Sequence, residues 1–198
     1  MISSINKSLI TLFLGLASVG AIAEDSKLYG AFDFGQTTEK DPCSGAPTTI
    51  YCSDAAMAYR FGLGYQAISN VALEVTYQPS TEIAATGSYF GSPVSAKAKS
   101  SAFQFSAIGS YPVTENISLA GKVGVAFIEA DASVTNAGST SSQSYNNLNF
   151  TYGLGMLFPF KNKVAIRVMY EDYGDVKTSS TGTGRKLTCL SAGMQFGL

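Results

Sequence analysis

Six charged residues fall within stretches of this sequence that otherwise alternate apolar residues with small or polar ones. Arg60 and Glu74, for example, lie in the run YRFGLGYQAISNVALEVTYQ, residues 59–78. Period-two alternation places all six on one face of their segments, and three are acids and three are bases. We therefore expect them together in an enclosed interior. The six are Asp33, Arg60, Glu74, Lys122, Arg167 and Glu171.

Such a set of charges suits either a structural network or a gate. Breaking a buried ion pair destabilises a protein by roughly 3 to 5 kcal/mol, so these side chains are expected to pair. Counted from the short-turn end of each segment, Glu74 and Arg167 lie at similar heights. Asp33, Arg60 and Lys122 lie somewhat higher. We predict a structural charge network first, with a gate or narrow ion path as the alternative.

Catalytic chemistry has little support in the residue types. Lipase, acyltransferase and protease sites need a base beside a nucleophile or water, and the usual base is His. The chain has no His. The remaining combinations are a Ser with Lys122, an inward structural residue, and the carboxylates Glu171 and Asp172, which lie at the edge between a strand and a loop. We therefore predict that the protein is not an enzyme and needs no cofactor.

The three cysteines predict one disulfide. Cys43 and Cys52 lie nine residues apart in a polar, Pro-containing stretch, where a disulfide would constrain a loop in an oxidising compartment. Two cysteines without His are too few ligands for a metal, and the string EDYGD lacks the full ligand set of an EF-hand loop. We expect no metal site. Cys189 is left over and is expected to be a small buried residue.

The elements that position the six charges are eight alternating segments, each long enough to cross a bilayer as a tilted strand. Their connections alternate between short turns and long loops rich in Ser, Thr and Gly, which are expected to be mobile. The segments are 27–36, 56–67, 71–79, 101–112, 117–129, 147–158, 164–172 and 187–198, and the long loops are 37–55, 80–99, 130–145 and 173–186.

The composition decides which way the apolar faces point. Only 14% of residues are charged, so a soluble sandwich with its apolar faces inside would expose a surface of Gly, Ala and Ser. Lipid is the better neighbour for the apolar faces. Aromatic residues also fall near both ends of the segments, as in the girdles of membrane barrels. They are Tyr65, Tyr111, Phe158 and Phe196 at the short-turn end, and Phe34, Tyr77, Phe127 and Tyr170 at the long-loop end.

The first 23 residues have the pattern of a secretory signal. Lys7 precedes the apolar run LITLFLGLASVGAIA, which ends in a small-residue cleavage pattern at Ala21 and Ala23. The run is short for a membrane anchor, so we expect cleavage and a single domain over residues 24–198. Removing Lys7 leaves 12 basic and 14 acidic residues, with no basic patch for nucleic acid.

Several stretches resemble the eight-stranded transmembrane barrel of outer-membrane protein A and its small relatives. They are GYQAISNVALEVTY, SYPVTENISLAGKVGV and KVAIRVMYEDYGD, and the similarity spans essentially all of residues 24–198. The peptidoglycan-binding domain of full-length members is not found. In that family an inward Glu and Arg belong to a polar plug proposed to act as a gate, and Glu74 and Arg167 match them. A further acidic position of the plug corresponds to Leu157, which disfavours gating by partner exchange.

The sequence thus predicts an all-β, eight-stranded antiparallel up-and-down transmembrane β-barrel with short periplasmic turns and long extracellular loops. We expect it in the outer membrane of a Gram-negative bacterium, surrounded by outer-membrane lipid and lipopolysaccharide, as a monomer. Its predicted role is structural, with loops that bind something outside. The alternatives are a narrow porin-like channel and an adhesin or host-factor binder.

Overall fold

The computed structural model describes residues 27–40, 49–89, 92–136, 138–160, 163–177 and 184–198. The predicted signal peptide lies outside these ranges, so its cleavage stays a prediction. None of the helices among the described residues is long and apolar enough to cross a membrane.

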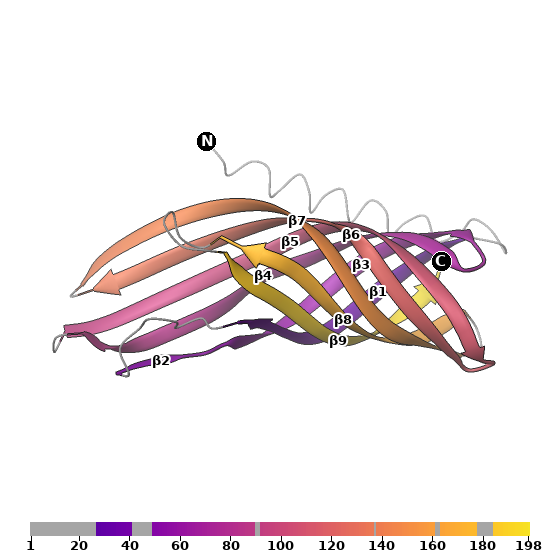
Figure 1. The fold of residues 1–198 in the computed structure, drawn as a ribbon, viewed down its shortest axis with the longest axis horizontal. Coiled ribbons are helices and arrows are strands. Elements are labelled where there is room, and N and C mark those ends of the chain that lie inside the picture. Colours follow the sequence, from indigo (N-terminus) through magenta and orange to yellow (C-terminus); the bar gives the residue numbers. More distant parts are fainter. Residues whose placement is uncertain (1–26, 41–48, 90–91, 137, 161–162, 178–183) are drawn as a thin grey trace.

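The described residues contain nine strands, which form one antiparallel sheet that closes on itself (Figure 1). β1 pairs with both β3 and β9, and the pairing of β4 with β5 closes the ring of eight strands. β2 lies outside that ring, and within the described ranges its strand partner is β4. The eight-stranded antiparallel barrel is therefore confirmed. The strands are β1 (Leu28–Glu39), β2 (Ile50–Cys52), β3 (Ala55–Ile68), β4 (Val71–Tyr89), β5 (Ser92–Thr114), β6 (Ile117–Asn136), β7 (Ser139–Pro159), β8 (Val164–Val176) and β9 (Arg185–Gly197).

Two of the predicted long loops, residues 80–99 and 130–145, are mostly strand instead of irregular loop. β4 and β5 stay paired as far as Tyr89 and Ser92, and β6 and β7 as far as Asn136 and Ser139. Their Ser, Thr and Val residues fit a pleated sheet well, and a two-residue connection lets each strand pair at little entropic cost. The loop over residues 37–55 likewise contains β2.

We call this outer part of the sheet the blade. It consists of residues 79–89, 92–101, 129–136 and 139–147, with β2 on one edge. Figure 1 shows these strands extending well beyond the ends of β8 and β9. The blade therefore projects from one end of the barrel as a single sheet.

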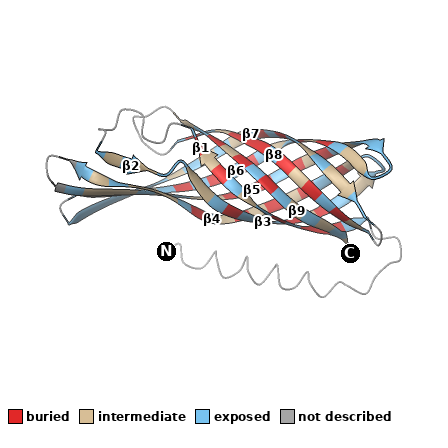
Figure 2. Ribbon diagram, turned by 90° about the horizontal axis from the view of Figure 1, so that it is seen from below, coloured by how far each residue is buried: buried red, intermediate tan, exposed pale blue. Residues whose placement is uncertain are grey.

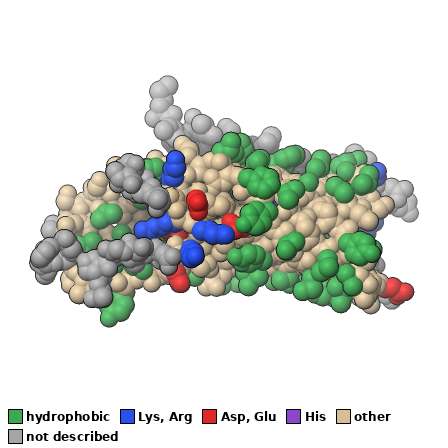
Figure 3. Space-filling model, viewed as in Figure 1, with side chains coloured by type: hydrophobic (Ala, Val, Ile, Leu, Met, Phe, Trp, Pro, Cys, Tyr) green, Lys and Arg blue, Asp and Glu red, His purple; other side chains and the backbone are tan. Residues whose placement is uncertain are grey.

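Alternation along the strands separates a buried interior from an apolar outer surface (Figure 2). Tyr59 and Phe61 are 46% and 42% exposed, whereas Arg60 between them is 1% exposed. Figure 3 shows hydrophobic side chains covering the barrel on the visible face, with charged side chains near the two ends of that band. This surface fits a lipid environment.

Aromatic side chains lie in rows near both ends of the apolar band. Tyr77, Phe103 and Phe127 occupy directly paired positions on β4, β5 and β6, and Leu148 continues the row on β7. At the other end Tyr65 and Tyr111 are exposed. The row at the blade end marks the upper limit of the apolar belt, because Glu129 and Asp131 follow on the same face of β6.

Candidate functional site

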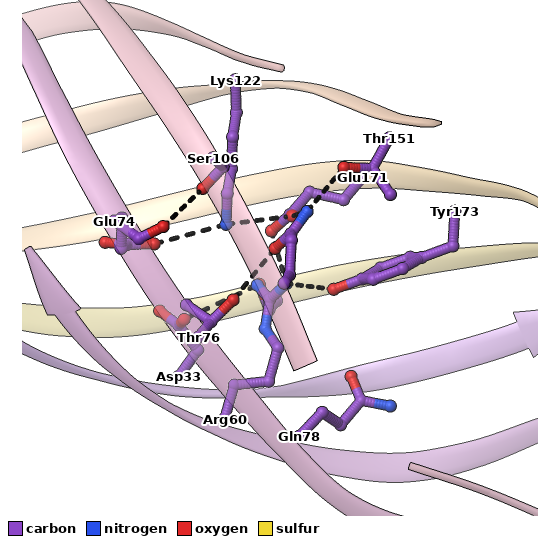
Figure 4. Close-up of polar contacts among 12 residues, drawn as sticks. Asp33, Arg60, Glu74, Thr76, Gln78, Ser106, Lys122, Thr151, Glu171 and Tyr173 are labelled. Carbon is purple, nitrogen blue, oxygen red and sulfur yellow. Dashed lines mark hydrogen bonds and ion pairs between the residues drawn. The ribbon is translucent and has the colours of Figure 1, made fainter. Parts of the chain in front are cut away.

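The six charged residues predicted to face inward all lie in the barrel interior. They come from five strands, since β8 supplies two of them, and each side chain is at most 3% exposed. Figure 4 shows the members of this set that it labels pointing toward one another across the barrel; they are Asp33, Arg60, Glu74, Lys122 and Glu171. Each side chain contacts two side chains of opposite charge, so the ion pairs form a closed ring. Its order is Asp33, Arg167, Glu74, Lys122, Glu171, Arg60 and again Asp33.

Arg167 makes the shortest contacts on one side of this charge ring. Its Nε donates to Asp33 Oδ1 at 2.6 Å and its Nη2 to Asp33 Oδ2 at 2.5 Å, a bidentate pair. Its Nη1 donates to Glu74 Oε2 at 2.5 Å. Glu74 also accepts from Lys122 Nζ at 3.3 Å and from the Tyr29 hydroxyl at 3.0 Å. All charges on this side are compensated.

Glu171 occupies the corresponding position on the other side of the charge ring. Arg60 Nη1 donates to Glu171 Oε1 at 2.5 Å, and Lys122 Nζ lies 3.1 Å from Glu171 Oε2. Arg60 closes the ring through Asp33, with Nη2 3.6 Å from Oδ2. That contact is the longest ion pair of the ring. Arg60 also donates to the Tyr173 hydroxyl at 2.9 Å and to Ser191 Oγ at 2.6 Å.

Glycines let charged residues two strands apart meet. Gly193 of β9 pairs with Asp33 on one side and with Arg167 on the other, and a Cβ at Gly193 would lie 2.3 Å from Asp33 Oδ1. Gly153 of β7 stands in the same way between Lys122 and Glu171. Since any side chain at these positions would fill the space of the ion pair, the ring requires glycine there.

Neutral polar residues support the charge ring, and the sequence interpretation did not include them. Gln104 Nε2 donates to Thr151 Oγ1 at 2.8 Å and to Glu171 Oε2 at 3.2 Å, while Thr76 donates to Gln104 Oε1 at 3.0 Å. These residues occupy the inward-facing positions of their alternating strands, as the six charges do, so the same alternation could have identified them. Among the buried side-chain atoms of the described residues, Arg60 Nε and Gln78 Oε1 have no hydrogen-bond partner.

The heights predicted for the charged residues, counted from the short-turn end of each strand, were only partly right. The pair expected from similar heights, Glu74 with Arg167, is present. Asp33 was placed higher but is the bidentate partner of Arg167. Counting along each strand ignores the stagger between neighbouring strands, which shifts residues of equal count to different levels.

The remaining candidates are not brought together as a site. Glu171 lies in the charge ring, whereas Asp172 contacts Lys186 Nζ at 2.7 Å and the Tyr152 hydroxyl at 2.8 Å. The two carboxylates therefore do not form an acid–base pair. Within the described ranges no group of three or more His, Cys, Asp and Glu residues could hold a metal ion.

The cysteines are described only in part. Cys189 is a buried free cysteine, in line with the prediction for it. Cys43 lies outside the described residues, so the disulfide between Cys43 and Cys52 stays a prediction.

The interior on the side of the charge ring away from the blade contains a small cavity. Its volume is about 20 Å³, roughly the space of one water molecule. Ile108, Leu157 and Met169 line it together with Arg167, and no carboxylate is among its lining residues. The other lining residues include the neutral polar side chains of Gln66, Ser110 and Gln195, so the ring is backed by a small cavity without an acidic group.

Solved structures with this architecture are small membrane barrels. Neisserial surface protein A is 16% identical, with a TM-score of 0.53 over 87% of this chain and 98% of that chain. Ail of Yersinia pestis, solved with the heparin analogue sucrose octasulfate, is 15% identical, with a TM-score of 0.53 over 86% of this chain and 99% of that chain. These similarities establish the fold. No match is found among curated proteins.

A family model gives the assignment that the fold alone does not. The model of the OmpA-like transmembrane domain matches residues 23–197 and so covers every described strand. The chain belongs to the OmpA-like transmembrane domain family and is a bacterial outer-membrane β-barrel with a buried salt-bridge network.

Proposed function

We propose that this protein is a monomeric structural barrel of the outer membrane whose interior is closed to solutes and whose blade makes contacts outside the cell. The observation that carries the proposal is the closed charge ring. Every carboxylate in it already contacts two cations, and the cavity behind it holds about one water.

Gating by partner exchange is disfavoured by the residues behind the ring. If Arg167 swung away from Glu74, it would enter a cavity lined by Leu157, Ile108 and Met169 without a carboxylate. An uncompensated buried charge costs about 3 to 5 kcal/mol. The exchange therefore has no acidic partner among the residues that line this cavity.

A non-catalytic role follows from the same side chains. The chain lacks His, and Lys122 Nζ already contacts both Glu74 and Glu171, so it is not placed beside a nucleophile as a general base must be. We infer that the barrel is not an enzyme.

Single-channel recording of the refolded protein in planar bilayers tests the closed interior. We expect no steady conductance from the wild-type protein. The double variant Arg60→Ala/Glu171→Ala removes one acid and one base together, so it widens the interior without leaving a net charge, and its conductance should rise. A control is the exposed pair, Glu82→Ala/Lys97→Ala, which should behave as the wild type does. Steady wild-type conductance equal to that of the widened variant would contradict the proposal.

The blade supports a second candidate function, the binding of an extended segment of an extracellular protein. β7 pairs with β8 only from Tyr152 onward, and the side chains of Asn147 and Asn149 hydrogen-bond to the backbone of residues 173–177. The outer edge of residues 139–146 therefore has no strand partner among the described residues. That stretch contains no charge and no Pro, the residues that usually protect an edge from strand addition. The predicted adhesin role would use this edge. Ail, a structural neighbour, was solved with a heparin analogue, which supports a surface-binding role for such barrels.

Adhesion of cells that display the protein would test the edge. Thr140→Lys/Ser142→Lys places charges on the open edge and should reduce adhesion. Ser133→Lys is the matched control, because Ser133 is paired with Ser142 but lies on β6, which has partners on both sides. Equal adhesion by all three proteins would argue against binding at this edge.

A further inference from the structure

The open edge of the blade is the side of residues 139–146 of β7 that faces away from β6. β6 pairs with every residue of this stretch, from Asn136 opposite Ser139 to Glu129 opposite Asn146. On the other side, no backbone hydrogen bond from the described part of the chain reaches these residues. Residues 139–144 are all exposed. A row of backbone N–H and C=O groups is therefore available to a further strand.

The charges of the blade lie on inner strands and not on this edge. Edge strands of natural sheets usually carry Lys or Pro, which discourages pairing with another chain. Here the charged residues of β5 and β6 lie on strands that have neighbours on both sides. They are Lys97, Lys99, Glu129 and Asp131. The open edge thus lacks the usual protection against strand addition.

The side chains of the open edge suit a second copy of the same strand. Its sequence is STSSQSYN, in which hydroxyl and amide groups both donate and accept hydrogen bonds. The blade already contains such a pair, because Thr135 Oγ1 and Thr140 Oγ1 lie 2.8 Å apart across β6 and β7. Two copies of this stretch would also bring no like charges together. The open edge is therefore complementary to itself.

The direction of β7 determines how two copies would meet. β7 begins at Ser139, at the tip of the blade, and reaches its pairing with β8 in the barrel at Tyr152. Figure 1 shows the beginning of β7 far from β8 and β9. Antiparallel pairing about a two-fold axis perpendicular to the sheet would place the two barrels at opposite ends of the joined blades. The two barrels would then lie in opposing membranes.

Parallel pairing of the same two edges is less favourable. A parallel ladder is slightly less stable per residue than an antiparallel one. It would also turn one blade over, so that the inner face of one copy continued the outer face of the other. The inner face carries the directly paired Ala98 and Ala132, and the outer face carries the directly paired Lys99 and Asp131. Antiparallel pairing keeps the apolar faces on one side and the charged faces on the other.

We propose that the open edge binds the open edge of a second copy of this protein in the outer membrane of an opposing cell, as one continuous antiparallel sheet. The paired stretch is short, so a single contact is weak and the protein stays a monomer within its own membrane. Many copies on two cells act together and hold the cells in contact. The proposal rests on the open edge of the second candidate function and names its partner, and it does not depend on the closed charge ring.

Mixed clumping of two cell populations tests the proposal. Both populations display the full-length protein, and each carries its own fluorescent label. Wild-type populations should form mixed clumps. With Thr140→Lys/Ser142→Lys in both populations, like charges meet on the outer face, and clumping should fall by about tenfold. Thr140→Glu/Ser142→Glu should have the same effect. Lysine-variant cells mixed with glutamate-variant cells should clump again, because opposite charges then meet.

Thr86→Lys/Ser88→Lys is the matched control. Both residues are exposed, and they have the same spacing as the edge pair. Thr86 lies in one row across the blade with Ser95, Thr135 and Thr140. However, β4 has β2 on one side and β5 on the other at this position. This variant adds the same charge away from the open edge, so its cells should clump as wild-type cells do.

Four outcomes would overturn the proposal. The first is the absence of mixed clumps between wild-type populations. The second is clumping of the lysine variant equal to that of the wild type, with folding verified by heat-dependent mobility on gels. The third is no recovery in the mixture of lysine and glutamate variants. The fourth is equal clumping of wild-type cells with cells that lack the protein. That result would place a different surface molecule at the edge and would leave the second candidate function intact.

Discussion

The blade continues four of the eight strands that enclose the barrel interior, but the two regions are held together by different interactions. In the interior, residues from strands that are not neighbours meet across glycines, as Asp33 and Arg167 do across Gly193. In the blade, contacts run mainly between paired neighbours, such as Glu82 with Lys99. The interior is therefore cooperative across the whole barrel, whereas each part of the blade depends on its adjacent strand.

The largest expected effect comes from removing one member of the charge ring. Glu171→Ala leaves Arg60 and Lys122 each with one carboxylate fewer in a buried site. We expect the free energy of unfolding to fall by about 3 to 5 kcal/mol. Urea unfolding in lipid vesicles measures it, and a loss below about 1 kcal/mol would mean that this ion pair behaves as an exposed one.

A smaller effect is expected from filling a glycine between two ring members. In Gly193→Ala the new Cβ would collide with Asp33 Oδ1, and overpacking of this kind costs about 1 to 3 kcal/mol. Gly109→Ala is the control, because nothing lies within 4 Å of a Cβ at Gly109. Equal unfolding free energies for the two variants would show that the ring tolerates displacement.

The interaction between Glu74 and Arg167 can be measured to test whether residues of the interior stabilise one another across the barrel. Glu74→Gln, Arg167→Met and the double variant form a cycle in which the coupling of residues in direct contact is about 0.5 to 3 kcal/mol. The double variant should lose less stability than the two single variants together, because each single variant leaves a charge unpaired. Additive losses would mean that the two side chains do not interact.

The smallest effect is expected in the blade. The pKa of Glu82 is lowered by its hydrogen bond from Lys97, so the small stability it contributes is present above the pKa of the unfolded chain and is lost as pH falls through the folded pKa. Glu82→Gln should leave the midpoint of unfolding at pH 7 unchanged, because the pair is exposed and screened. A clear shift of that midpoint, measured by the same urea titration, would show that the blade contributes to global stability.

The inward position of all six charges could be predicted because alternation is a local property of each strand. Arg60 lies between Tyr59 and Phe61 in the sequence, and that spacing alone puts it on the opposite face. The partner of each charge could not be predicted in the same way. Asp33 meets Arg167 because of the register of β1, β9 and β8, which depends on residues far apart in the chain.

The blade was missed for a related reason. Residues 130–145 are rich in Ser, Thr and Asn, a composition shared by loops and by polar strands, so only the presence of a neighbour distinguishes them. Strand pairing between β5 and β6 supplies that neighbour. The sequence likewise showed that Gly153 and Gly193 are small residues on the inward face. It could not show that they lie between ion-paired side chains, because that depends on strand register.

The amino-acid sequence by itself determined the closed antiparallel barrel, its membrane-facing side and the identity of its buried charges, because these follow from a period of two and from the scarcity of charge. Only the tertiary structure decided that the charges form a ring, that Gly193 and Gly153 make room for it, and that the sheet continues as a blade. Those features depend on strand stagger and pairing, which bring together residues that no local pattern relates.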